Sequence, residues 1–135
     1  MNIYPSLISS NILNIETTLK TLDPVCDGYH LDVMDDHFVP NLTWGPAFIN
    51  AIVAKTELPV HVHLMVDNPE KWVGRLTLES KDSFIFHVET VQNFGFGKDI
   101  IQEVKKISGV KVGLAVNPKT DVSEIEGFVP LLDEI

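Results

Sequence analysis

Two short stretches of the chain place side chains that can bind a metal at alternate positions. In residues 29–34, His30 and Asp32 alternate with apolar residues, and residues 59–65 repeat the pattern with His63. Because alternate side chains of a β-strand point to one face, each stretch predicts a strand with a polar face. Two neighbouring strands would bring two imidazoles and a carboxylate together, which is enough to bind a divalent metal with an open coordination position. The pattern favours a catalytic site over a structural one.

The composition is that of an ordinary globular protein. The chain has 135 residues, of which 44% are hydrophobic and 21% charged, so we expect a single domain with a real core. Ten basic and 19 acidic residues give a net charge of −9, which argues against nucleic acid or an anionic membrane as a partner. An anionic small molecule stays open, because backbone amides and helix N-termini bind phosphate whatever the net charge.

The sequence also predicts a cytoplasmic location. Cys26 is the single cysteine, so no internal disulfide can form, which fits a reducing compartment. The first residues contain no basic region followed by an apolar run, so no signal peptide is expected. No apolar run is long enough to span a membrane.

Short apolar runs alternate with longer amphipathic segments along the whole chain. We expect strands at residues 2–7, 29–34, 59–65, 83–89 and 111–116. We expect helices near residues 14–22, 45–54, 69–79, 97–107 and 121–133. Repeated strand–helix units imply parallel strands joined by crossover connections.

The fold class expected from this order is α/β, with either an open doubly wound sheet or a TIM (β/α)8 barrel. The barrel is favoured because polar residues lie within and at the ends of several strands, where barrel enzymes keep their chemistry. No glycine-rich phosphate loop follows the first strand. Five units in 135 residues give 27 residues each, and eight would need roughly 216. We therefore expect residues 1–135 to form the N-terminal portion of a barrel.

Several blocks of the sequence resemble the ribulose-phosphate 3-epimerase family in their order and spacing. They are Pro5-Ser6-Leu7, residues 30–35 (HLDVMD), residues 37–41 (HFVPN), residues 63–66 (HLMV) with Pro69-Glu70, residues 87–89 (HVE) and residues 113–118 (GLAVNP). The combined block from His30 to Asn41 is the most specific of them, unlike an isolated His-x-Asp.

The resemblance implies an incomplete TIM barrel of the ribulose-phosphate-binding type. The family interconverts D-ribulose 5-phosphate and D-xylulose 5-phosphate by inverting carbon 3. By motif, His30, Asp32 and His63 match three of four protein ligands of a catalytic divalent metal, which we expect to be Zn²⁺ or Fe²⁺, with Mn²⁺ or Co²⁺ as alternatives. Asp32 also matches one of two acid/base carboxylates. We expect a sugar-phosphate substrate and a homo-oligomer.

The resemblance further implies that Ser6, His63, Met34 and Met65 contact the substrate or line its site. The chemistry fits these residue types. Removing the proton next to a carbonyl creates an enediolate, whose charge a metal stabilises. Inversion then needs carboxylates on both faces of this planar intermediate. Methionines can pack against the reacting carbon without offering a competing proton.

The sequence departs from the family pattern in three ways. Asp36 stands where the family has glycine, and Asn11 stands where it has aspartate. The family's C-terminal part, which supplies the second catalytic aspartate, the fourth metal ligand and the phosphate-binding loops, has no counterpart here. Asp133 precedes the position of that aspartate, so we do not assign it this role.

Other functions stay open at this point. The chain could be a truncated inactive fragment or an assembly partner, because the outer strands of an incomplete barrel have edges that invite pairing with another chain. A metal-dependent hydrolase could use the same scaffold, and an allulose 6-phosphate 3-epimerase would keep the same metal residues.

Five further polar residues have simpler alternative interpretations. We interpret His61 as a strand histidine and not as a ligand. His87 and Glu89 have a spacing that could bind metal, but we favour a hydrogen-bonded layer inside the barrel. Asp35 and His37 could either shape the loop after residue 34 or take part in the chemistry, and the sequence leaves both open.

Overall fold

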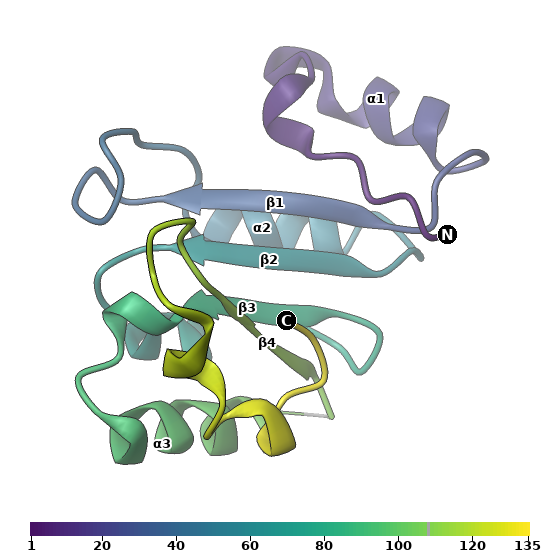
Figure 1. Cartoon of the computed structure of the whole chain (residues 1–135). Helices are drawn as coiled ribbons and strands as arrows, with labels where there is room; N and C mark the ends of the chain where they lie inside the picture. Colours follow the sequence, from purple (N-terminus) through teal and green to yellow (C-terminus); the bar gives the residue numbers. More distant parts are fainter. Residues whose placement is uncertain (108) are drawn as a thin grey trace.

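Four parallel strands form a single sheet in the computed structural model of this chain, which describes residues 1–107 and 109–135. The strands pair in chain order (Figure 1). They are β1 (Tyr29–Met34), β2 (Val60–Met65), β3 (Ser83–His87) and β4 (Lys111–Ala115). All four coincide with predicted strands, so the α/β class and the parallel sheet are confirmed as part of a TIM-barrel-type fold.

Three α-helices accompany the sheet within the described part of the chain. They are α1 (Ile15–Leu22), α2 (Pro46–Val53) and α3 (Phe94–Lys105). Figure 1 shows α2 behind the sheet, with α1 and α3 at its two sides. All three lie within or overlap predicted helical segments, because each carries an apolar stripe that packs into the core.

The first two strands show the predicted alternation of burial. In β1 and β2 every second residue is fully buried, and the residues between them are only partly buried. The buried set includes Leu31, Val33, Val62 and Leu64. Each such side chain stabilises the fold by roughly 1.5–3 kcal/mol on burial. The same alternation turns the partly buried polar side chains to the opposite face.

The strand predicted at residues 2–7 is wrong. The segment makes a single parallel bridge, between Ser6 and His30, before a 3₁₀ turn, η1 (Leu7–Ser9), begins. Pro5 has no N–H for a second ladder bond, although its carbonyl accepts from the His30 N–H at 3.0 Å. The segment therefore lies beside β1 without extending the ladder.

The α-helix predicted at residues 69–79 is also wrong. A 3₁₀ helix, η3 (Pro69–Arg75), is followed by an extended stretch in which Leu76 and Leu78 are buried. The Asn50 side chain replaces the missing helical turn, because it donates to the Arg75 carbonyl and accepts from the Thr77 N–H, both at 3.0 Å. The backbone groups are thereby satisfied without a helix.

The last predicted helix, at residues 121–133, is replaced by two 3₁₀ turns. These are η5 (Val122–Ile125) and η6 (Val129–Leu131). Gly127 and Pro130 interrupt the helical pattern, since glycine is a poor helix former and proline has no N–H with which to continue the hydrogen bonds of an α-helix. Beyond η6, Glu134 forms a parallel bridge with Gly113 of β4.

Two smaller differences concern strand and turn boundaries. The strand predicted at 83–89 ends at His87, and η4 (Val88–Thr90) follows it directly. η2 (Ile12–Asn14) precedes α1. None of the described helices is long and apolar enough to cross a membrane.

Gly28 allows the N-terminal segment to approach the start of β1, which generates a stability prediction. A Cβ atom at this buried position would lie 2.6 Å from the Pro59 carbonyl oxygen and would also overlap the Tyr4 ring. We expect Gly28→Ala to lower the free energy of unfolding by about 1–3 kcal/mol, because the backbone carbonyl cannot move aside cheaply. Urea denaturation followed by circular dichroism measures this change.

Gly74→Ala is the matched control for this variant. Gly74 is exposed, and a Cβ atom there would meet nothing within 4 Å. We expect a change within about 0.5 kcal/mol for this variant. Equal stability losses in both variants would contradict the close approach at Gly28.

Candidate metal centre

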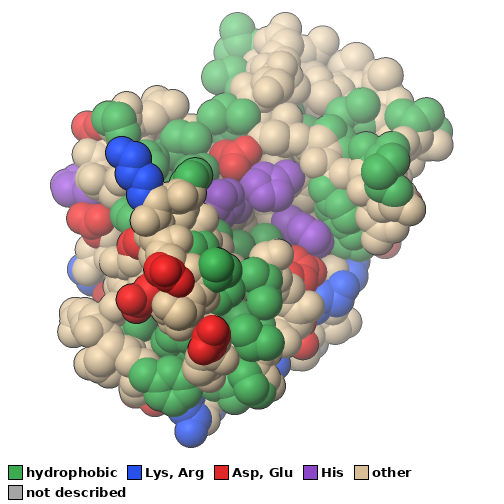
Figure 2. All heavy atoms as spheres, viewed as in Figure 1, with side chains coloured by type: hydrophobic (Ala, Val, Ile, Leu, Met, Phe, Trp, Pro, Cys, Tyr) green, Lys and Arg blue, Asp and Glu red, His purple; other side chains and the backbone are tan. Residues whose placement is uncertain are grey.

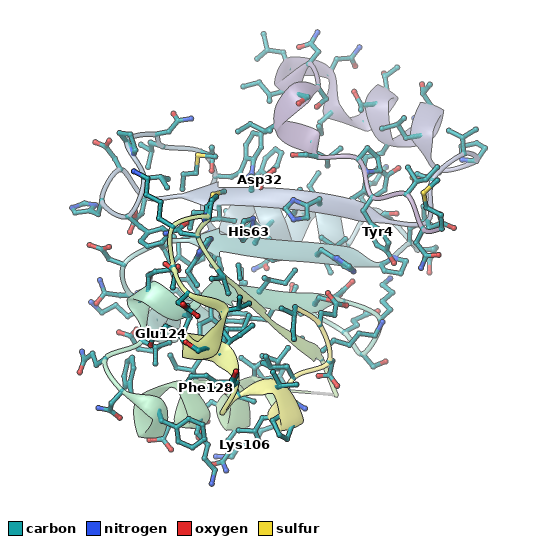
Figure 3. The ribbon with its side chains drawn as sticks, in the orientation of Figure 1. Tyr4, Asp32, His63, Lys106, Glu124 and Phe128 are labelled. Atoms are coloured by element: carbon teal, nitrogen blue, oxygen red, sulfur yellow. The ribbon has the colours of Figure 1, made fainter. Side chains whose placement is uncertain are left out.

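His30, Asp32 and His63 come together on the inner face of the sheet. The register of β1 with β2 pairs Asp32 with His63 directly, and His30 lies two residues before Asp32 on the same face. One potential ligand atom from each of the three side chains lies within 4.8 Å of the others. Figure 3 shows Asp32 and His63 side by side on neighbouring strands. The predicted cluster is therefore present as a geometric arrangement.

The distances in this cluster suit a small divalent cation. The Nδ1 atoms of His30 and His63 each lie 3.3 Å from Asp32 Oδ1. Ligands around tetrahedral zinc, with bonds of about 2.0–2.1 Å, lie about 3.3 Å from one another. Two imidazoles and one carboxylate are also donor types that zinc and iron accept. The residues present fit a metal, and three protein donors would leave a coordination position open.

Asp32 is held as a carboxylate by its neighbours. Burial alone raises its pKa, but hydrogen bonds with His30, His63 and Ser6 outweigh burial and bring the pKa well below its ordinary value. The side chain is 16% exposed, so these partners replace most of its contact with water. Asp32 is therefore charged at neutral pH, as a metal ligand must be.

The other predicted site residues surround this cluster. Ser6 donates a hydrogen bond from Oγ to Asp32 Oδ2, so the N-terminal segment reaches the site even though it is not a strand. Met34 and Met65 are paired in register at the ends of β1 and β2, two residues beyond Asp32 and His63. Both methionines are partly buried. The structure thus places all the predicted site residues on neighbouring positions.

His87 and Glu89 form the predicted hydrogen-bonded layer and are not part of the metal cluster. His87 Nε2 lies 2.9 Å from His63 Nε2, and His87 Nδ1 lies 3.1 Å from Glu89 Oε2. The other Glu89 oxygen, Oε1, accepts from the Asn117 N–H at 2.7 Å. Burial and the nearby His63 lower the pKa of His87, so its imidazole is neutral at neutral pH.

His61 stands apart from the cluster, as predicted, but its surroundings were not foreseen. Its ring stacks on Tyr4 with centroids 4.1 Å apart, and its Nε2 lies 3.6 Å from Glu134 Oε1, with no hydrogen-bond partner among the described residues. Ser83 donates to the same Glu134 oxygen at 2.7 Å. No local pattern links residues this far apart in sequence.

Asp35 shapes the loop after β1. Its carboxylate accepts hydrogen bonds from the backbone N–H groups of His37, Phe38 and Asp67, at 2.9–3.0 Å. His37 is exposed and touches the Asp35 carbonyl through Nδ1. Both residues therefore organise the loop.

Two departures from the family pattern have structural roles near this face. Asp36 has a φ of 60°, which explains why glycine is suited to that position. Asn11 accepts a hydrogen bond from the Leu13 N–H and so caps η2. Thr43, which the sequence did not single out, accepts from the Met34 N–H and donates to the Asp32 carbonyl, fixing the end of β1.

Histidine side chains gather at the centre of one face of the molecule. Figure 2 shows them between the N-terminal helical part and the C-terminal segment, with an acidic side chain among them. His30, Asp32 and His63 are 28%, 16% and 20% exposed, so a small molecule can reach the cluster from solvent.

Comparison with known proteins finds one family that matches nearly the whole chain. A sequence model described as the Ribulose-phosphate 3 epimerase family matches residues 2–135. The chain is 35% identical over 134 residues to the ribulose-phosphate 3-epimerase of Chlamydia trachomatis serovar D and 33% identical to that of Bacillus subtilis, covering 98% of this chain in each case. It is 34% identical over 132 residues to the chloroplastic ribulose-5-phosphate-3-epimerase of Arabidopsis thaliana, covering 97% of this chain.

These relatives are longer than the chain. The matched region spans 56% of the Chlamydia protein, 60% of the Bacillus protein and 46% of the Arabidopsis protein. The chain thus corresponds to about half of such a protein.

The geometry of the cluster predicts that Asp32 contributes strongly to metal affinity. We expect Asp32→Asn to weaken Zn²⁺ binding by at least ~10-fold, because a neutral amide is a poor substitute for a carboxylate between two imidazoles. Competition with a chromophoric chelator measures the affinity. Asp36→Asn, which also removes one carboxylate but is exposed in a left-handed conformation that Asn tolerates, should bind as the wild type does. Equal affinity for the wild type and Asp32→Asn would remove Asp32 from the site.

Proposed function

The chain belongs to the ribulose-phosphate 3-epimerase family, and from this premise we propose that it carries the metal-binding part of an isomerase that interconverts D-ribulose 5-phosphate and D-xylulose 5-phosphate. The observation that carries the proposal is the convergence of His30, Asp32 and His63 within 4.8 Å on the inner face of the sheet. Ser6, Met34 and Met65, the other residues expected to contact the substrate, adjoin this cluster.

Asp32 is the base in the proposed reaction. Its carboxylate is ionised and partly exposed, so it can take the proton from the carbon next to a ketose carbonyl. Ser6 holds one carboxylate oxygen in place by donating to Oδ2. Met34 and Met65 offer an apolar, polarizable surface beside the reacting carbon, without a proton that could compete.

His30, Asp32 and His63 would hold the metal, with Zn²⁺ or Fe²⁺ as the preferred ions and Mn²⁺ or Co²⁺ as alternatives. When bound, it supplies a Lewis acid that stabilises the negative charge developing on the substrate oxygens. The single carboxylate among these ligands would offset only part of the charge of a divalent ion, so the site would keep positive charge to balance the negative charge that develops on the substrate.

Inversion at carbon 3 also needs an acid on the other face of the substrate. Asp35 follows β1 and Glu89 follows β3, but their carboxylates accept hydrogen bonds from backbone N–H groups. Unlike the side-chain donors around Asp32, such backbone donors cannot rotate away, so both carboxylates are committed to structure. We assign the second proton transfer to a carboxylate outside residues 1–135. The chain by itself should then perform only half of the reaction.

This assignment predicts that the chain exchanges the hydrogen on carbon 3 with solvent without inverting that carbon. In D₂O with added Zn²⁺, we expect the chain to exchange the C3 hydrogen of one of the two pentulose 5-phosphates for deuterium, because a single base serves one face. Proton NMR of D-ribulose 5-phosphate and D-xylulose 5-phosphate, measured separately, follows both exchange and epimerisation.

Variants and chelator decide how this result is interpreted. Chelator should abolish exchange, and Asp32→Asn should slow it by ~100-fold or more, whereas Asp36→Asn should leave it unchanged. Absence of exchange with both sugars would contradict the role of Asp32 as the base. Full epimerisation by the chain alone would instead contradict the assignment of the second carboxylate.

A further inference from the structure

A continuous chain of hydrogen bonds runs from the backbone of Asn117 to the metal cluster. The Asn117 N–H donates to Glu89 Oε1 at 2.7 Å, and Glu89 Oε2 lies 3.1 Å from His87 Nδ1. His87 Nε2 lies 2.9 Å from His63 Nε2, and His63 Nδ1 faces Asp32. The proposed reaction uses His63 and Asp32 but leaves His87 and Glu89 without a role.

The Asn117 end of this series of hydrogen bonds decides which group donates and which accepts at each step. A backbone N–H can only donate and a carboxylate can only accept, so Glu89 must accept from His87 Nδ1 as well as from Asn117. A neutral imidazole carries a single N–H, so the Nε2 atom of His87 is left with a lone pair. His63 must therefore donate from its own Nε2 to His87.

Burial protects this arrangement from competition by water. The His87 side chain is 7% exposed, and the Phe38 ring packs against it with centroids 4.8 Å apart. The imidazoles of His63 and His87 are stacked with centroids 5.0 Å apart. Solvent has little access to a proton held between them.

We propose that Glu89 and His87 are positioning residues that set the tautomer of His63. This role rests on the proposed metal site. With the Nε2 proton held by His87, Nδ1 is the nitrogen whose lone pair can bind a metal, and it is the one that faces His30 and Asp32. A proton that Nδ1 shares with Asp32 in the metal-free protein leaves to solvent when the metal binds. A second layer of this kind orients the ring and raises the basicity of a ligating histidine. It also fixes which nitrogen binds.

Glu89→Gln tests the proposal because it keeps the shape of the side chain and exchanges donor for acceptor in the hydrogen bonds from residue 89 through His87 to His63. The amide oxygen must stay on the Asn117 N–H, so the amide NH₂ faces His87 Nδ1 and donates to it. His87 then carries its proton on Nε2, and His63 is left with its proton on Nδ1, where the metal should bind. We expect Zn²⁺ affinity to fall by about 10–100-fold.

His87 variants separate hydrogen bonding from packing. His87→Gln can place an amide oxygen near the position of Nε2 and donate to Glu89, so it should lose less than about tenfold in Zn²⁺ affinity. His87→Phe keeps an aromatic ring beside Phe38 but offers no acceptor, so it should lose more than His87→Gln. Glu124→Gln, an exposed change of the same type, is the control and should bind as the wild type does.

The wild-type chain provides a test that does not depend on any variant folding. In the Zn²⁺-loaded, ¹⁵N-labelled protein we expect His63 Nε2 to carry a slowly exchanging proton and Nδ1 to show the shift of a metal-bound nitrogen. Competition with a chromophoric chelator at a fixed pH gives the affinities, and circular dichroism establishes that each variant is folded.

Three results would count against the metal site or the positioning role, and they can be told apart. If the wild type does not bind Zn²⁺, the proposed metal site fails and the positioning role fails with it. If the wild type binds but Glu89→Gln binds equally well, only the positioning role is overturned. Coordination of Zn²⁺ through His63 Nε2 would overturn it as well.

Discussion

The parallel, in-register pairing of β1 with β2 is the constraint on which the rest of the site depends. It sets Asp32 directly beside His63, and neighbouring strands are about 4.8 Å apart, within reach of one ion. A slip of one residue would turn His63 to the helix side and bury it. Leu31 and Leu64, which are fully buried on that side, oppose such a slip. The apolar core and the polar cluster are thus two results of one register.

What could be predicted from the sequence was local. The alternation in residues 29–34 and 60–65 reports which face each side chain takes, so strand positions and the cluster of Asp32 with His63 followed from it. The extended stretch after Arg75 could not be foreseen, because its backbone partner is the Asn50 side chain, 25 residues away. Helical periodicity does not report that a distant side chain can take the place of a helical hydrogen bond.

At the two outer edges of the sheet, residues outside any strand still bring polar side chains to the inner face. Ser6 and Glu134 each make only one bridge to the sheet, with His30 and Gly113 respectively. Each nevertheless delivers a polar group to the inner face, where Ser6 meets Asp32 and Glu134 meets Ser83. The sequence motif predicted Ser6 at the site, and Ser6 lies beside Asp32 although the strand predicted around it is absent. Glu134 has no such motif, and its partner lies 51 residues away.

The Asn50 side chain has a consequence for how such a fold can change over time. One amide satisfies both the Arg75 carbonyl and the Thr77 N–H, so a single residue compensates for the loss of a helical turn. These contacts lie in the outer layer, whereas Asp32 and His63 lie on the inner face. The outer layer can therefore exchange a helical turn for a side-chain contact without moving the residues that face the inside of the sheet.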